Sequence, residues 1–290
     1  MQSVLVIGES LIDIVHRADG RSVEYAGGSA ANVAVALARL GRPVRFVTAW
    51  ADDARGRVLA RHLADAGVDL ASDPVVLERT ATAAATIGVD GSASYEFDLS
   101  WRIGEVEVAE PVVVHVCSIG AVLEPGAGQV LEVLRGLEGA TVTYDINVRP
   151  AITGTGPDLV ARVERMAAAA DVVKASDEDL EALYPHLDPT AAARHVLTLG
   201  PSAVVVTRGG DGATWVSTEH TVEVASLPVD VADTIGAGDT FGAAVIDALW
   251  DRSPDRLTTA EIEEVLAHAA RAAAVTVSRP GADPPYRSEL

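Results

Sequence analysis

Cysteine is almost absent from this sequence of 290 residues, and its single copy, Cys117, excludes an internal disulfide. Because Cys117 lies within the apolar run 112–117, we expect a buried structural thiol rather than a nucleophile. Lysine is equally scarce, with Lys174 as the only one. The 22 basic residues are outnumbered by 42 acidic ones, which gives a formal net charge of -20 at pH 7. This balance argues against a nucleic acid or an anionic membrane as partner, but it leaves room for a small phosphorylated ligand.

Long hydrophobic runs are also missing. The apolar segments at 4–7 and 111–117 are too short to span a bilayer, and the N-terminus has no basic segment followed by a cleavage site. We therefore expect a cytoplasmic protein. The chain has 49% hydrophobic and 22% charged residues, as globular proteins do, and its length fits a single α/β domain over residues 1–290.

Short β-branched runs recur along the chain and are continuous rather than alternating, which predicts strands buried on both faces. They occupy residues 4–7, 44–48, 112–117, 141–146, 171–175 and 203–207. Between them, apolar residues at helical spacing lead to a glycine that suits a helix end, as Val33, Leu37 and Leu40 lead to Gly41. This alternation predicts a doubly wound, mostly parallel sheet with helices on both faces.

Two segments, residues 12–25 and 80–100, depart from this pattern because their apolar residues alternate with polar ones. The pair Asp90-Gly91 is a strong signal for a hairpin turn. We expect a small separate sheet that stands off the main body. A lid over a site and a subunit interface are equally compatible with it, and its exposed edge strand favours a homodimer through the lid.

Ligands of open α/β sheets bind outside the carboxyl ends of the strands. At those ends this sequence places polar residues and glycines, namely Gly8 and Glu9, Asp145 and Asn147, Lys174 and Ser176, and Thr207 and Gly209. We therefore expect a site along one rim of the sheet.

The string GAGD at 236–239 precedes an apolar helix pattern formed by Phe241, Val245 and Leu249. The first turn of a helix offers unpaired N–H groups and the positive end of the helix dipole, so the glycines can bring the backbone close to a phosphate. Asp239 would repel that anion unless it takes the proton from an alcohol that attacks the phosphorus. A capping aspartate behind a glycine turn is the structural alternative. A dinucleotide loop is disfavoured because no first strand precedes the string.

A second string, AGGSAANVAVALARLG at 26–41, is a glycine pair that opens a helix of small residues. Asn32 lies in its first turn. Together with Asp13 it offers the paired donors and acceptors that suit vicinal sugar hydroxyls. A glycine turn with an asparagine in the capping region is the structural alternative.

The two strings resemble the two signature regions of the ribokinase/PfkB family of sugar kinases, and the likeness extends over nearly the whole chain. Three further segments resemble family pieces in the same order: ARGRVLARHLADAGVDL before the lid, TRGGDGA on the nucleotide side and AVTVSRPGADPP as the C-terminal nucleotide loop. The resemblance implies a ribokinase-like fold and a kinase that uses ATP and Mg²⁺. It makes Asp239 the catalytic base, with the backbone of Gly236, Ala237 and Gly238 as the anion hole.

The resemblance also implies the remaining site residues. The sugar would be held by Asp13, Gly27, Gly28 and Asn32, and the similar run DINVRP and the end of the lid add Asn147, Arg149 and Arg102 as candidates. The nucleotide side would comprise Lys174, Ser176, Thr207, Gly209 and Gly212, with His268 at the purine edge. Asp179 would reach Mg²⁺ through water, and Asp233 would lie near a monovalent cation such as K⁺.

The opening GESLIDIV and the stretch VVKASDEDLEALYP are similar to fructokinase-type members, in which Ser176 and Asp179 replace an asparagine and a glutamate of the wider family. We therefore expect transfer of the γ-phosphoryl group of ATP to a primary hydroxyl of fructose. Ribose, 2-keto-3-deoxygluconate and a nucleoside are alternative acceptors, and a catalytically inactive sugar sensor is the alternative of another class. A nicotinamide oxidoreductase is disfavoured because VLVIGESLID lacks a G-x-G-x-x-G turn.

Overall fold

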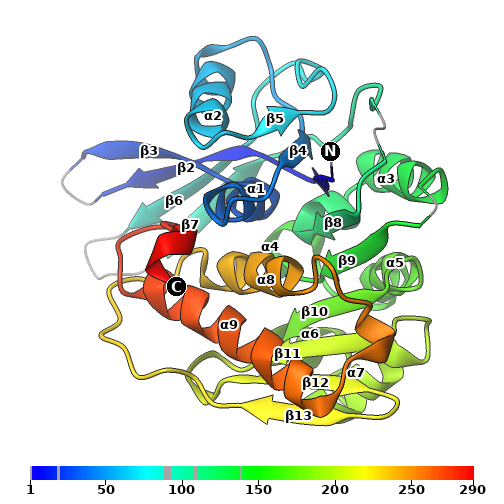
Figure 1. The fold of residues 1–290 in the computed structure, drawn as a ribbon. Helices are drawn as coiled ribbons and strands as arrows, with labels where there is room; N and C mark the ends of the chain where they lie inside the picture. Colours follow the sequence, from blue (N-terminus) through cyan, green and yellow to red (C-terminus); the bar gives the residue numbers. More distant parts are fainter. Residues whose placement is uncertain (1, 18–19, 88–92, 108–109, 138) are drawn as a thin grey trace.

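The computed structural model describes residues 2–17, 20–87, 93–107, 110–137 and 139–290. Its main element is a nine-stranded sheet in the order β13-β12-β11-β10-β9-β8-β1-β4-β5 (Figure 1). The strands are β1 Val4–Ile7, β4 Val44–Val47, β5 Asp69–Leu70, β8 Val113–Cys117, β9 Thr141–Asp145, β10 Val172–Ser176, β11 Ala203–Thr207, β12 Ala213–Ser217 and β13 Thr221–Val224. From β11 to β5 all neighbours are parallel, which confirms the mostly parallel sheet expected from the continuous apolar runs. The antiparallel pair β12 and β13 was not predicted.

Helices cover both faces of this sheet, as the alternation of runs predicts. They are α1 Ser29–Arg39, α2 Ala54–Asp65, α3 Gly126–Arg135, α4 Pro150–Thr153, α5 Pro157–Ala167, α6 Asp177–Leu183, α7 Pro189–Leu197, α8 Ala237–Ala248 and α9 Thr259–Val277, with short 3₁₀ turns η1 Ser118–Ala121, η2 Gly209–Asp211, η3 Pro254–Arg256 and η4 Arg287–Glu289. Within the described ranges, no helix is long and apolar enough to cross a membrane.

The two faces have separate hydrophobic cores because side chains alternate along each strand. Leu5 and Ile7 of β1 pack in the core that contains α3, α5, α6 and α7. Val4 and Val6 point the other way, into the core with α1, α2 and α8. Helices α8 and α9 pack against each other across this second face, in front of the sheet in Figure 1. The start of α8 lies near the carboxyl end of β10, because a Cβ at Gly238 would lie 3.6 Å from Lys174 Nζ.

A separate four-stranded sheet stands to one side of the body, with strand order β3-β2-β6-β7 (Figure 1). Its strands are β2 Leu11–His16, β3 Ser22–Gly27, β6 Thr82–Ile87 and β7 Ala93–Asp98. Ile12 and Ile14 are buried in the main core, so Asp13 between them lies on the opposite face. Strands β6 and β7 pair as an antiparallel hairpin, whereas the predicted turn at Asp90-Gly91 lies outside the described residues. Because the two sheets share core residues, we propose that residues 1–290 form one domain.

Candidate active site

The anion loop, residues 236–239, opens helix α8 as the sequence predicts. Gly236 precedes the helix in a left-handed conformation with φ of 74°, and a side chain there would meet the Cβ of Ala282 at 2.6 Å. The N–H of Ala237 donates to the Thr234 carbonyl at 3.3 Å and is therefore engaged in a turn. Within the described part of the chain, the N–H groups of Gly236, Gly238 and Asp239 have no partner. These three donors, rather than that of Ala237, are free for an anion.

Asp239 is the carboxylate beside this loop, and it is only 8% exposed. Its Oδ1 accepts a hydrogen bond from Ser29 Oγ at 2.6 Å, and its Oδ2 accepts one from Asn32 Nδ2 at 2.8 Å. Asn147 Nδ2 in turn donates to Ser29 Oγ at 2.9 Å. Two segments that lie far from Asp239 in the sequence, residues 29–32 and Asn147, thus fix the carboxylate. Sequence reasoning missed Ser29, although its position directly after Gly28 was a usable signal.

Asp13 of the small sheet stands next to the glycine pair. A Cβ at Gly27 would lie 2.2 Å from Asp13 Oδ2, so only glycine leaves room for this carboxylate. Burial raises the pKa of Asp13 from 3.8 to about 6, against the opposing positive charge of Arg149. Among the described residues, no group donates a hydrogen bond to the Asp13 carboxylate. Asp13 is therefore a half-buried acceptor that can take a hydrogen bond from a ligand group such as a sugar hydroxyl.

Glu9 lies beneath the same network and was not assigned a role from the sequence. It is 5% exposed, and its two carboxylate oxygens accept hydrogen bonds from the backbone N–H groups of Ser29 and Gly120, each at 3.2 Å. Burial raises the pKa of Glu9 from 4.5 to about 7, and the nearby Asp239 adds to this effect. Glu9 thus ties the start of α1 to η1 and holds Ser29 where it meets Asp239.

The raised pKa of Glu9 gives a testable pH dependence of stability. Between about pH 4.5 and 7 the folded state keeps a proton that the unfolded chain has lost, so the contribution of Glu9 to the free energy of unfolding falls as pH rises. The glutamine of Glu9→Gln does not titrate, so the variant does not have this pH dependence. We expect the free energy of unfolding of the variant minus that of wild type, measured by chemical denaturation, to increase by about 3 kcal/mol from pH 5 to pH 8. A difference that does not change with pH would contradict the assignment.

A buried ion pair lies behind the loop. Lys174 Nζ donates to Asp145 Oδ2 at 2.7 Å, and both side chains are almost fully buried. Burial raises the pKa of Asp145 to about 6 although the Lys174 ammonium opposes it, and the carboxylate in turn keeps the pKa of Lys174 above its usual value despite burial. Cys117, at the end of β8, is buried as predicted, and burial holds the pKa of its thiol well above its ordinary value.

The predicted nucleotide side follows strands β10 and β11, where Ser176 and Thr207 are paired in register. The Asp179 carboxylate accepts hydrogen bonds from the N–H groups of Ser176 at 2.8 Å and Val148 at 2.9 Å, so it both caps α6 and fixes the loop around Asn147. Gly209 and Gly212 have positive φ angles of 49° and 95° in the turn before β12. In the described part of the chain, no group of three or more His, Cys, Asp or Glu side chains is arranged to hold a metal.

Three of the predicted site residues, Asp233, Arg102 and His268, contact other parts of the chain. Asp233 accepts hydrogen bonds from the N–H groups of Ile235 and Gly281, at 3.0 and 2.9 Å, and so holds the C-terminal loop beside the anion loop. Arg102 donates from Nε to the Val76 carbonyl at 2.6 Å and lines a cavity of about 370 Å³ next to the end of β7.

His268, expected at the purine edge, has its ring 2.9 Å from Asp247 Oδ2. Asp247 is eight residues beyond Asp239 on α8, which corresponds to about 12 Å along the helix. Arg42 and Arg287 contact the same carboxylate. The structure therefore gives His268 a structural partner at the far end of α8, and its place at the purine edge stays a prediction.

Comparison with known proteins agrees with this geometry. The sequence pattern of pfkB family carbohydrate kinases matches residues 1–289. The chain is 36% identical over 260 residues to a fructokinase of Rhizobium leguminosarum bv. trifolii, across 85% of this chain and 79% of that protein. Its fold is similar to that of aminoimidazole riboside kinase from Salmonella enterica complexed with aminoimidazole riboside and an ATP analog, with a TM-score of 0.81 and 26% identity over 97% and 95% of the two chains.

A second solved structure is similar to the same extent. It is a fructokinase double mutant from Vibrio cholerae O395 in a form bound to fructose, ADP and potassium ion, with a TM-score of 0.80 and 27% identity over 97% of this chain and 94% of that one. Since the family pattern covers nearly the whole chain, this protein belongs to the pfkB family of carbohydrate kinases and is a phosphotransferase with the ribokinase-like fold.

Proposed function

We propose that this kinase transfers the γ-phosphoryl group of ATP to a primary hydroxyl of fructose. The observation that carries the proposal is the buried Asp239 carboxylate, which Ser29 and Asn32 hold beside three free N–H donors at the start of α8. A proton acceptor next to an anion site is the arrangement that phosphoryl transfer to an alcohol requires. The fructokinase relative at 36% identity supports fructose as the acceptor.

In the proposed reaction Asp239 takes the proton of the attacking hydroxyl. The sugar oxygen forms a bond to the γ-phosphorus, and the bond between that phosphorus and the bridging oxygen of ATP breaks, leaving the electron pair on ADP. The N–H groups of Gly236, Gly238 and Asp239 face the charge on the transferred group. Because their positions are fixed before the reaction, they stabilise that charge without reorganisation.

The sugar would be held from the side of the small sheet. Asp13 has no hydrogen-bond donor among the described residues and lies beside Arg149, so it can accept hydrogen bonds from two neighbouring hydroxyls. Asn32 and Asn147 keep the acceptor close to Asp239, because both belong to its hydrogen-bond network. Gly27 leaves the space that the Asp13 carboxylate needs, and Gly28, where a side chain would meet the Glu9 carbonyl at 2.7 Å, lets the backbone pass close to Glu9. Arg102 would join from the base of the lid.

The nucleotide would lie along Ser176, Thr207, Gly209 and Gly212, with Lys174 behind the anion loop. Magnesium supplies positive charge to phosphate oxygens in such reactions and is bound mainly by those oxygens and by water. One carboxylate, Asp179, therefore suffices on the protein side, and we propose that it acts through water. The potassium ion in the Vibrio cholerae fructokinase structure supports a monovalent cation near Asp233.

The choice of sugar is tested by ADP release. The assay would contain ATP, magnesium and, in turn, fructose, ribose, 2-keto-3-deoxygluconate and aminoimidazole riboside. The last acceptor is included because the similar Salmonella enterica structure contains it. We expect kcat/KM for fructose to exceed that for each other acceptor by about tenfold or more, the discrimination that a few specific contacts provide. A higher value for another acceptor would replace fructose. Sugar binding without ADP release from any acceptor would instead identify a sensor.

We also propose that the protein is cytoplasmic and that its small sheet mediates a homodimer. Residues opposite one another in the strand pairing share a face, so Tyr25, Asp13 and Phe97 line up across it, with Tyr95 in the next row. Tyr25 is 51% and Tyr95 63% exposed, and Tyr95 stacks on Phe97 with ring centroids 6.3 Å apart. We propose that a second copy of the chain covers this face.

Sedimentation in solution tests the dimer. We expect the wild-type protein to sediment as a dimer and Tyr95→Glu to shift it toward the monomer, because a charge there would be buried without a partner. A dimer with a Kd of about 1 µM would be mostly assembled at protein concentrations of tens of micromolar. A wild-type protein that stays monomeric at such concentrations would therefore contradict this proposal.

A further inference from the structure

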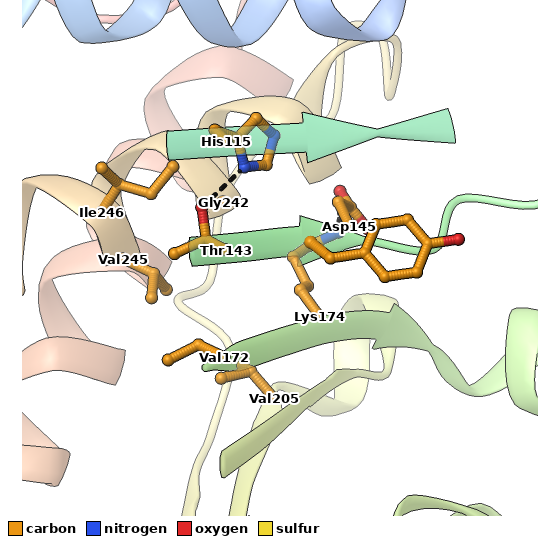
Figure 2. A pocket seen from close by; sticks show the side chains of 10 residues that line it. His115, Thr143, Asp145, Val172, Lys174, Val205, Gly242, Val245 and Ile246 are labelled. Carbon is orange, nitrogen blue, oxygen red and sulfur yellow. Dashed lines mark hydrogen bonds and ion pairs between the residues drawn. The ribbon is translucent and has the colours of Figure 1, made fainter. Parts of the chain in front are cut away.

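A cluster of buried polar side chains lies behind helix α8, on the strands β8, β9 and β10 (Figure 2). Lys174 and Asp145 form its ion pair, with 11% and 2% of their side chains exposed. His115 Nδ1 lies 2.9 Å from Thr143 Oγ1 in the same cluster, and burial lowers the pKa of His115 to about 3, so its ring is neutral. The cluster borders a cavity of about 20 Å³, enough for one water molecule, which Gly242 closes from the side of α8.

This ion pair is costly for the fold. Taking two charges out of water carries a large desolvation penalty, and apolar residues of similar size would often serve stability equally well. The polar groups are also incompletely satisfied, because among the described residues Asp145 Oδ1 and His115 Nε2 have no hydrogen-bond partner. A contribution to fold stability alone therefore does not account for a lysine at position 174.

The orientation of the pair relative to α8 points to a role in the anion loop. A Cβ at Gly238 would lie 3.6 Å from Lys174 Nζ, and apart from its chain neighbours and the backbone of α8 no other described atom lies within 4 Å of that position. One turn further along α8, a Cβ at Gly242 would lie 3.6 Å from Lys174 Cδ and 3.9 Å from Asp145 Oδ2. The ammonium thus stands behind the loop and the carboxylate lies deeper along the helix. The pair is aligned with the helix dipole and its positive end faces the anion site.

The interior position makes this charge effective. Charges interact more strongly in a low-dielectric interior than in water, and only 11% of the Lys174 side chain is exposed. Asp145 at 2.7 Å, with Asp179 and Asp239 nearby, stabilises the charged form of Lys174. Gly238 is exposed to solvent, so a phosphoryl group can reach the loop at this residue.

We propose that the Lys174–Asp145 pair strengthens the anion loop from behind: Lys174 adds positive potential at Gly238 without touching the nucleotide, and Asp145 positions Lys174. The inference rests on the proposed kinase function. It differs from a direct contact of Lys174 with ATP, because Lys174 Nζ is bound to Asp145 at 2.7 Å within the buried cluster. Asp145 is a positioning residue in this arrangement, since it acts only through Lys174.

The test replaces the pair by neutral, hydrogen-bonding side chains, Lys174→Gln together with Asp145→Asn. Removing both charges avoids the strong destabilisation that a single unpaired buried charge causes. Two quantities are measured by calorimetry, the Kd of ADP and the Kd of a non-hydrolysable ATP analogue, and kcat is measured with the best sugar. We expect binding of the analogue to weaken about tenfold while the Kd of ADP changes less than about twofold, and kcat to fall about 10- to 100-fold.

The matched control is Asp247→Asn. Asp247 is also a buried carboxylate paired with basic side chains, but it lies at the far end of α8. We expect this variant to lose stability and to keep the wild-type ratio of the two Kd values. A neutral pair that is folded and keeps the wild-type ratio and kcat would overturn the inference. If wild type binds both nucleotides but phosphorylates no sugar, the proposed function fails. The ratio of the Kd of the ATP analogue to the Kd of ADP then still shows whether the Lys174–Asp145 pair strengthens the anion loop.

Discussion

Replacing Asp239 by asparagine is expected to lower kcat by about 10²–10⁴-fold, the usual contribution of a general base, while the KM for sugar changes less than about threefold. The physical reason is that asparagine keeps the shape of the side chain but cannot accept the hydroxyl proton. The network around it tolerates the change, because Asn32 can still donate to the amide oxygen and Ser29 Oγ can accept from the amide N–H. Steady-state ADP release and calorimetric sugar binding measure the two quantities.

The same substitution at Asp247 provides the control, because it removes a buried carboxylate of the same helix without touching the anion loop. We expect Asp247→Asn to retain kcat within about threefold at a temperature where the variant is folded, although it breaks contacts to Arg42 and His268. A fully active Asp239→Asn enzyme would remove the general-base assignment. The anion loop would then have to supply the acceleration alone.

The second large effect is expected at Gly27. Its φ angle is not positive, so alanine fits the backbone, but the new Cβ would lie 2.2 Å from Asp13 Oδ2. The carboxylate must rotate away, and the sugar loses hydrogen bonds to a charged acceptor that are worth about 1.5–3 kcal/mol. We therefore expect Gly27→Ala to raise the KM for the sugar about 10- to 100-fold with a smaller change in kcat, because binding is lost equally in the ground and transition states.

Gly136→Ala is the matched control for this variant. Gly136 is exposed at the end of α3, and a Cβ there would make an ordinary contact of 3.5 Å with the Val133 carbonyl. Its KM for the sugar is expected to equal that of wild type. An unchanged KM in Gly27→Ala would mean that Asp13 does not bind the acceptor, and a reduced kcat at constant KM would move Asp13 into the chemical step.

Much of the fold was predictable because it depends on local patterns. Continuous apolar runs identified the parallel strands, and alternating runs identified the small sheet, because burial on two faces or on one leaves different periodicities. The antiparallel pair β12 and β13 was missed, since it follows the glycine turn at Gly209 and Gly212 that was assigned to the nucleotide. The anion loop and Asp239 were found because glycines before a helix carry a local meaning.

Other parts of the site depend on contacts between distant segments. Ser29 and Glu9 are ordinary polar residues in the sequence, and only the structure shows that one bonds to Asp239 and the other fixes the backbone of Ser29. The N–H of Ala237 was expected in the anion hole, but a turn to Thr234 occupies it. His268 follows the helical pattern of α9, and nothing local indicates that its ring meets Asp247.

The sequence by itself determined the doubly wound sheet, the separate sheet and the chemical character of the loop at 236–239, because periodicity and the conformational freedom of glycine act over a few residues. The tertiary structure alone decided which groups surround Asp239 and which charge stands behind Gly238. Ser29, Asn147 and Lys174 come from different elements, and their distances are set by the packing of α1 and α8 on the sheet. Long-range packing of this kind leaves no trace in the spacing of residues along a single chain.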